Sequence, residues 1–232
     1  MSDESITTNI KIILIGDSKT GKTSILNQYI NKQFSYNFLS TIGIGNSQKE
    51  IVFDNKKIIL DIWDTAGQER FSKLNKLFMK NSKIVILVYD ITSKDSFEHL
   101  KNNWYEQVKT FIDISTIIVG IAANKHDLYM DEVITIDEAT IFSESINAFL
   151  YETSATEFDS VNHLFYSLVE QYFNKFLKRE QIQDNENTSF ELNKEEEIKE
   201  ESSCCIKKKK NKENKNIMKM KTKLKKIKFF KV

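Results

Sequence analysis

The chain has 232 residues, enough for one domain with appendages or for two small domains. Its formal net charge is only +1, but the charge is unevenly spread. Residues 206–232 contain thirteen Lys and one Glu, and residues 180–205 contain nine acidic residues and two Lys, which leaves the preceding part mildly acidic. This balance argues against nucleic-acid binding by that part. The chain lacks an apolar leader and a run of about 18 apolar residues, so we expect neither a signal segment nor a membrane span.

Strand-length apolar runs alternate with helical patterns along the first three quarters of the chain. The runs cover residues 10–15, 51–53, 58–63, 84–89, 117–122 and 148–151. Between them, helical spacing is clearest from Phe97 to Phe111, where Ser93 is a predicted N-cap, and a final apolar helix follows residue 160. Alternating strands and helices predict an α/β fold, a mostly parallel six-stranded sheet with helices on both faces. Ligands bind such sheets at the carboxyl ends of the strands.

The first run leads into a glycine-bounded loop that fits the phosphate-binding pattern G-x-x-x-x-G-K-[ST], and a helical segment follows it. Backbone N–H groups of such a loop, together with the helix N-terminus, point at an anion. Lys22 can reach the β- and γ-phosphates, and the Thr23 hydroxyl can bind Mg²⁺. The competing interpretation is an ordinary strand–turn–helix junction. The predicted phosphate-binding residues are Gly16, Asp17, Ser18, Lys19, Thr20, Gly21, Lys22, Thr23 and Ser24.

A second motif follows the run that ends at residue 63. Asp64 can hold Mg²⁺ through a water molecule, the Gly67 N–H can meet a γ-phosphate, and Gln68 can orient an attacking water. Gln68 is therefore the predicted catalytic residue.

Two further motifs predict a guanine pocket. After the fifth run, Asn124, Lys125 and Asp127 form an Asn-Lys-x-Asp sequence. The Asp127 carboxylate can accept hydrogen bonds from N1–H and the 2-amino group of guanine, whereas adenine lacks both donors. After the sixth run, Ser154 and Ala155 can close the pocket through backbone N–H groups.

With these four motifs in this order, residues 8–178 resemble a small GTPase of the Ras superfamily, specifically its Rab branch. The branch is indicated by Trp63-Asp64-Thr65-Ala66-Gly67-Gln68-Glu69-Arg70-Phe71, by Ser40-Thr41-Ile42-Gly43 and by Leu87-Val88-Tyr89-Asp90-Ile91-Thr92. Residues 120–125 also resemble early-endosomal Rabs. The resemblance implies that Thr41 binds Mg²⁺ and the γ-phosphate, and that Phe34 packs on the guanine edge.

The same resemblance implies a GDP/GTP switch in vesicle traffic, with Mg²⁺ as cofactor. It implies slow intrinsic hydrolysis and dependence on an exchange factor, a GTPase-activating protein and effectors. The expected location is cytoplasmic, peripheral on endomembranes. Two departures from the Rab pattern leave a slow tethering module open as an alternative. Lys19 occupies a loop position that is usually small, and residues 42–46 read Ile-Gly-Ile-Gly-Asn instead of Ile-Gly-Val-Asp-Phe.

The composition changes after residue 178. We therefore divide the chain into a GTPase domain at 1–178, an acidic linker at 179–205 that ends in Cys-Cys, and a lysine-rich extension at 206–232. The linker composition predicts disorder. Rabs end in prenylated cysteines, so Cys204 and Cys205 are candidate prenylation sites, although the extension follows them. That extension is a basic amphipathic membrane helix, a lysine-rich disordered segment, or translated non-coding sequence after a true Cys-Cys end.

Overall fold

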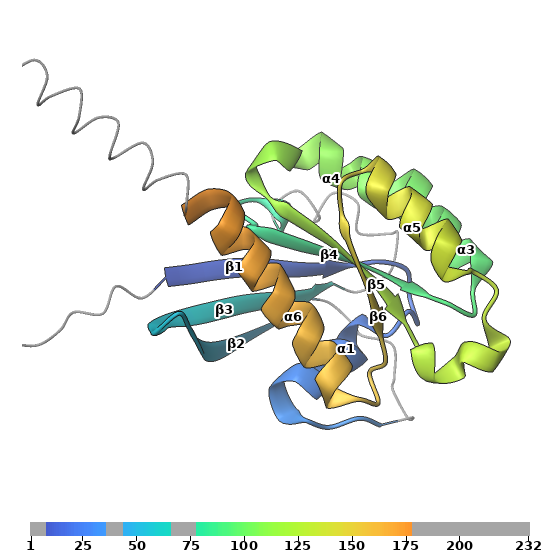
Figure 1. Cartoon of the computed structure of the whole chain (residues 1–232), viewed down its shortest axis with the longest axis horizontal. Coiled ribbons are helices and arrows are strands. Elements are labelled where there is room, and N and C mark those ends of the chain that lie inside the picture. The colour runs from blue at the N-terminus through green and yellow to red at the C-terminus, as the bar shows by residue number, and fades with distance from the viewer. Residues whose placement is uncertain (1–7, 36–43, 66–77, 178–232) are drawn as a thin grey trace, which may run out of the picture. The chain divides into compact units, whose positions relative to one another are not determined.

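A computed structural model of the chain describes residues 8–35, 44–65 and 78–177. Its six strands form one sheet in the order β2-β3-β1-β4-β5-β6 (Figure 1). Among these strands only β2 runs antiparallel to its neighbour, β3, and the other neighbouring strands are parallel. The strands are β1 (Thr8–Ile15), β2 (Ile44–Phe53), β3 (Lys56–Thr65), β4 (Ile84–Asp90), β5 (Ile118–Asn124) and β6 (Phe149–Thr153). The predicted mostly parallel six-stranded sheet is thereby confirmed.

The central strands are buried on both faces, which explains their continuous apolar sequences. Every residue of β4 and β5 is buried. The edge strand β2 differs, because it begins at Ile44 and not at residue 51 as its apolar run predicted. Residues 46–50 are polar, yet they pair with β3 through the backbone, which does not require apolar side chains. Asp54 and Asn55, both at positive φ, close the β2–β3 hairpin in two residues.

Helices cover both faces of the sheet, as predicted (Figure 1). On one face α1 (Lys22–Asn31) packs beside α6 (Phe158–Tyr172), and the Tyr29 and Phe165 rings stack with centroids 3.9 Å apart. On the other face a buried cluster joins Ile13 and Ile15 of β1 to most of the helical segments between β4 and β6, η4 (His126–Asp131) excepted. The joined segments are α3 (Lys94–His99), the π turn η2 (Leu100–Trp104), α4 (Tyr105–Phe111), η3 (Ile114–Thr116) and α5 (Ile136–Ser145).

The helix predicted after Ser93 is present, with one feature that the sequence pattern did not indicate. The Ser93 hydroxyl accepts a hydrogen bond from the Ser96 N–H, so the predicted N-cap is confirmed. Between α3 and α4, however, the helix widens into the π turn η2, where the Tyr105 N–H donates to the Leu100 carbonyl five residues back. Such turns are rare and concentrate at functional sites. This one lies beside residues 16–23, the predicted phosphate-binding loop, called the phosphate loop below, because Trp104 contacts Asp17.

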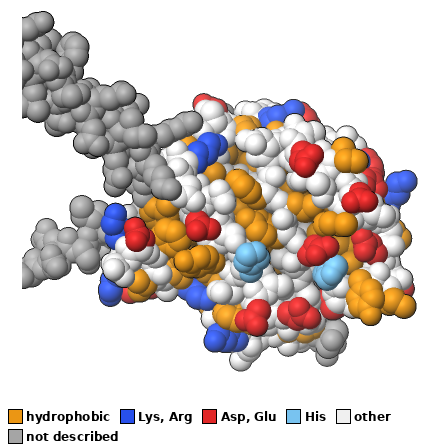
Figure 2. Space-filling model, in the orientation of Figure 1, with side chains coloured by type: hydrophobic (Ala, Val, Ile, Leu, Met, Phe, Trp, Pro, Cys, Tyr) orange, Lys and Arg blue, Asp and Glu red, His pale blue; other side chains and the backbone are white. Residues whose placement is uncertain are grey.

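On the face crossed by α6, acidic side chains are scattered, most of them over the right and lower parts of the view, while Lys and Arg side chains lie mostly towards the margins (Figure 2). None of the helices within the described ranges has the length and apolar character needed to cross a membrane. After α6 the chain continues as a second π turn, η5 (Phe173–Leu177). The compact unit that contains the sheet ends at Lys175. The division of the remaining chain into an acidic linker and a lysine-rich extension stays a prediction.

Candidate functional site

The strand register brings the sequence motifs to one edge of the sheet. Asp64 at the end of β3 is opposite Leu14, and β1 ends one residue later. Across the other half of the sheet, Asp90, Asn124 and Thr153 are register partners at the ends of β4, β5 and β6. Within the described ranges, the motif residues at the ends of β1, β3, β5 and β6 therefore lie along the same carboxyl edge.

The phosphate loop turns at two glycines that no other residue could replace without rearrangement. Gly16 has φ +155° and Gly21 has φ +94°. A Cβ at Gly16 would lie 2.1 Å from the Val88 carbonyl oxygen, and a Cβ at Gly21 would lie 2.2 Å from Nδ2 of Asn124. The loop thus packs its backbone directly against β4 and β5, and its tip stays exposed.

Lys19, at the exposed tip, adopts φ +69°. This backbone region costs a residue with a Cβ about 1 kcal/mol. Lys19 therefore carries backbone strain that a glycine would not have, and its charged side chain stays exposed.

Lys22, the first residue of α1, is buried, with 5% of its surface exposed. Its Nζ donates to the carbonyl oxygens of Gly16 at 2.8 Å and Asp17 at 2.7 Å. Burial lowers the pKa of Lys22 to about 8, and the carboxylates of Asp64 and Asp17 only partly offset that effect. A buried ammonium with a depressed pKa favours an incoming anion, because the added negative charge stabilises its protonated form.

Asp64 and Thr23 meet beside this lysine. The Thr23 hydroxyl donates to Oδ2 of Asp64 at 2.5 Å. The other oxygen, Oδ1, is buried and has no hydrogen-bond partner within the described ranges. Burial raises the pKa of the Asp64 carboxyl, while the Thr23 hydrogen bond and the Lys22 charge act against that rise. A hydroxyl and an unsatisfied carboxylate are the hard oxygen ligands that Mg²⁺ prefers, so these residues fit a magnesium ion.

The Asn-Lys-x-Asp motif is connected to the phosphate loop by its first residue. Asn124 is fully buried, and its Nδ2 donates to the Thr20 carbonyl at 2.7 Å. Its Oδ1 accepts a weak hydrogen bond from the Thr153 hydroxyl at 3.4 Å. The end of β5 thus holds the loop after β1, and the end of β6 holds Asn124.

Of the other guanine-motif residues, Ser154 contacts the exposed Asp127. The Ser154 hydroxyl donates to Oδ1 of Asp127 at 2.5 Å, which orients this carboxylate. Lys125, at φ +67°, forms an ion pair with Oδ2 of Asp90 at 2.5 Å. Ala155 is buried beside Ser154, and Phe34 is half-buried beyond the end of α1.

Several predicted residues fall outside the described ranges. They are Thr41, Gly67, Gln68, Cys204 and Cys205. Their predicted roles stay predictions.

Four residues that support the site were not predicted from the sequence. Asp90 was named only as part of the 87–92 motif and Thr153 was not assigned a role, yet they hold Lys125 and Asn124. The sequence singled out neither His99 nor Trp104, yet both contact Asp17 of the phosphate loop. The strand-end position of Asp90 was a usable signal, whereas nothing in the spacing pointed to His99.

Comparison with known proteins identifies the family of the chain. Residues 11–174 match the model of the Ras family. The chain belongs to the Ras family. Members of this family bind guanine nucleotides and are GTPases, so the coarse prediction of a small GTPase is confirmed.

Similar curated proteins place this Ras-family chain among Rab-like members. It is 35% identical over 178 residues to Ras-related protein Rab-2B of Dictyostelium discoideum, which spans 76% of this chain and 86% of the relative. It is 33% identical over 183 residues to Ras-related protein Rab11A of Lotus japonicus, with 77% and 80% covered. It is 30% identical over 207 residues to Ras-related protein RABA4d of Arabidopsis thaliana, with 85% and 92% covered. The early-endosomal subtype stays a prediction.

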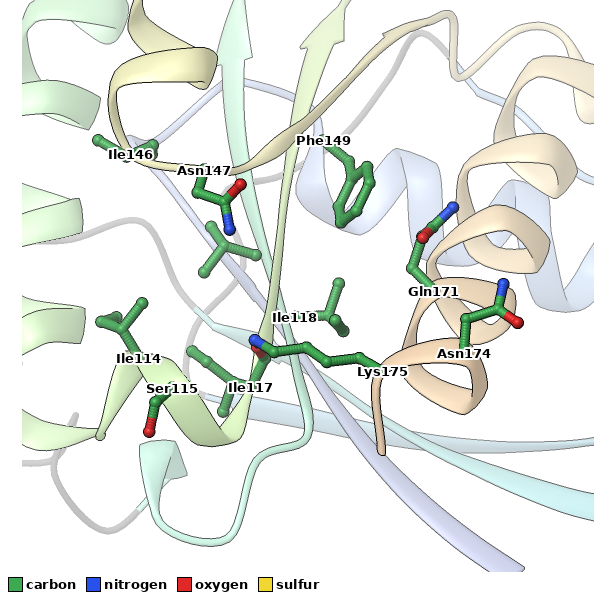
Figure 3. Close-up of a pocket in the computed structure, with 11 residues that line it drawn as sticks. Ile114, Ser115, Ile117, Ile118, Ile146, Asn147, Phe149, Gln171, Asn174 and Lys175 are labelled. Carbon is green, nitrogen blue, oxygen red and sulfur yellow. The ribbon is translucent and has the colours of Figure 1, made fainter. Parts of the chain in front are cut away.

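The Ras-family chain also has a pocket at the opposite edge of the sheet, where β5 and β6 begin (Figure 3). Ile117, Ile118 and Phe149 line it, and the Lys175 side chain crosses it to donate to the Ile117 carbonyl at 2.9 Å. None of the predicted nucleotide motifs contributes to its lining.

Proposed function

We propose that this Ras-family protein is a GDP/GTP-binding switch that hydrolyses GTP to GDP and regulates vesicle traffic. The observation that carries the proposal is the buried hydrogen bond from Asn124 to the Thr20 carbonyl. It joins the predicted guanine motif directly to the predicted phosphate loop, so both motifs can act on the same ligand. Neither motif alone would distinguish a nucleotide site from a strand-end turn.

Guanine selectivity rests on Asp127 in this proposal. Its carboxylate accepts from N1–H and the 2-amino group of the base, and the Ser154 hydroxyl fixes its orientation. Adenine would leave this carboxylate without donors, at a cost in binding. Lys125 and Phe34 flank the base, and the Ala155 backbone N–H closes the pocket.

Phosphate binding rests on Lys22 and on the backbone N–H groups of the glycine loop. Thr23 and Asp64, together with Thr41, would hold Mg²⁺, which neutralises charge on the phosphates when bound. Gly67 would donate its N–H to the γ-phosphate, and Gln68 would orient the attacking water. Without a supplied arginine the expected intrinsic rate is on the order of 10⁻⁴ to 10⁻² s⁻¹, so a GTPase-activating protein is the expected partner.

The role in traffic is supported by the Rab names of the similar proteins. In this role the γ-phosphate orders the segments around Thr41 and Gln68 for effectors, and an exchange factor reloads the switch. The protein would act at the cytoplasmic face of endomembranes, where prenylated Cys204 and Cys205 would anchor it. Nucleic acid is not an expected partner.

A tethering module with negligible hydrolysis is the second candidate, favoured by the strained Lys19 in the phosphate loop. A single-turnover assay on GTP-loaded protein separates the two. The switch predicts measurable conversion to GDP that Gln68→Leu reduces about tenfold or more. Equal rates in both proteins, at the level of GTP in buffer, would support the tether.

A further inference from the structure

Two side chains from the helical segment between β4 and β5 form hydrogen bonds with Asp17 of the phosphate loop. Its Oδ1 accepts from the indole Nε1–H of Trp104 at 2.6 Å, and its Oδ2 accepts from Nδ1–H of His99 at 2.6 Å. Both oxygens of this carboxylate are therefore engaged, and the side chain remains 20% exposed. Trp104 is buried, whereas the His99 side chain is 53% exposed.

The π turn η2 makes this double contact geometrically possible. His99 and Trp104 are five residues apart, and in an α-helix of 3.6 residues per turn such residues point about 140° away from each other. In η2 the Tyr105 N–H reaches back to the Leu100 carbonyl, so the turn contains an extra residue. The wider turn brings His99 and Trp104 to the same side, facing the loop.

The backbone of Asp17 is tied to the anion-binding part of the loop. Its carbonyl oxygen accepts from Nζ of Lys22 at 2.7 Å and from the Thr20 hydroxyl at 2.9 Å. The carboxylate thus points to the helix while the carbonyl points into the loop. Fixing the side chain fixes the carbonyl, and it also keeps a negative charge on the side of the loop away from an incoming phosphate.

We propose that His99 and Trp104 are positioning residues that pre-organise the phosphate loop through Asp17 and thereby strengthen nucleotide binding. This inference rests on the proposed function. Without the two donors, the nucleotide-free loop spends part of its time in conformations that cannot bind a nucleotide. The apparent affinity for the nucleotide then falls in proportion to the fraction of protein whose loop is in the binding conformation. Loss of one charge-assisted hydrogen bond corresponds to a change in affinity on the order of tenfold.

The test measures GDP association and dissociation rates with a fluorescent GDP excited directly, so that removing tryptophan does not affect the signal. Trp104→Phe keeps an aromatic ring but loses the N–H donor, and it should weaken GDP on the order of tenfold. His99→Leu should act similarly, and His99→Gln, which retains a donor, should recover most of the loss. In an Asp17→Ala background, Trp104→Phe should change the affinity less than about twofold.

The second tryptophan provides a matched control. Trp63 also donates its indole N–H to a carboxylate, Oδ2 of Asp61 at 2.8 Å, but on strand β3 and not on the phosphate loop. Trp63→Phe should leave GDP affinity within about twofold of wild type. The inference would be overturned if Trp104→Phe left GDP affinity unchanged, or weakened it equally in the wild-type and Asp17→Ala backgrounds. It would also be overturned if Trp63→Phe weakened GDP binding as much as Trp104→Phe does. Failure of the wild-type protein to bind GDP would instead refute the proposed function.

Discussion

Adding one methyl group at Gly21 should break the contact between the phosphate loop and Asn124 of the predicted guanine motif. The Cβ of Gly21→Ala would lie 2.2 Å from Nδ2 of Asn124, closer than any contact that packing tolerates. Asn124 is fully buried and already donates to the Thr20 carbonyl, so it cannot move without losing that hydrogen bond. The substituted residue would also be held at φ +94°, a region that favours glycine.

The expected cost follows from these two effects. A Cβ at positive φ costs about 1–2 kcal/mol, and a displaced buried hydrogen bond costs about 1–3 kcal/mol. A combined loss of roughly 2–5 kcal/mol corresponds to GDP binding that is weaker by about 30- to 4,000-fold. Because the loop tip is exposed and can relax in the free protein, most of this loss should fall on binding and not on folding.

The assay is GDP titration of nucleotide-free protein, combined with thermal unfolding of the same samples. Gly45→Ala is the matched control, since a Cβ there meets no atom within 4 Å, and it should bind GDP like wild type. In an Asn124→Ala background Gly21→Ala should cost only the backbone strain of about 1–2 kcal/mol. GDP binding by Gly21→Ala within about threefold of wild type would refute the tight contact between the loop and Asn124.

Four further predictions concern separate parts of the site and the tail. Asp127→Asn should shift preference from guanine to xanthine nucleotides, because the amide can donate to the 2-oxo group; unchanged GDP preference in a competition assay would contradict this. Thr23→Asn should weaken GTP more than GDP when both are measured with Mg²⁺, and an equal loss would count against its role as a ligand. GDP should bind more weakly as pH rises through about 8. In the nucleotide-free protein Lys22 then loses its proton, whereas bound phosphate would raise the pKa of Lys22 and keep it protonated. A GDP affinity that stays constant from about pH 7 to 9.5 would contradict this. Replacing Cys204 and Cys205 by Ser should release the protein from membranes while raised salt does not, and the opposite pattern in cell fractionation would favour attachment by the lysine-rich extension.

The sequence predicted those features that local spacing encodes. The continuous apolar runs located the central strands, because strands buried on both faces exclude polar residues. The phosphate loop was predictable because its glycines and lysine must occur at fixed offsets after a strand. The beginning of β2 was not, since residues 46–50 are polar and their pairing with β3 uses only the backbone.

Contacts between distant segments escaped prediction for a different reason. The hydrogen bonds of Asp17 to His99 and Trp104 depend on how a π turn is oriented over the sheet, which no residue pattern in the helix reports. The lowered pKa of Lys22 likewise reflects burial created by the whole fold. Sequence could identify Lys22 as a phosphate ligand but could not give the protonation behaviour that follows from its environment.

Guanine-nucleotide binding at the carboxyl edge of the sheet underlies every role proposed above. Calorimetric titration of nucleotide-free protein with GDP and, separately, with ADP, both in the presence of Mg²⁺, tests it directly. We predict tight binding of one GDP per chain and negligible binding of ADP, because only guanine offers donors to Asp127. Comparable affinities for GDP and ADP, or binding of neither, would show that this edge of the sheet is not a guanine-nucleotide site.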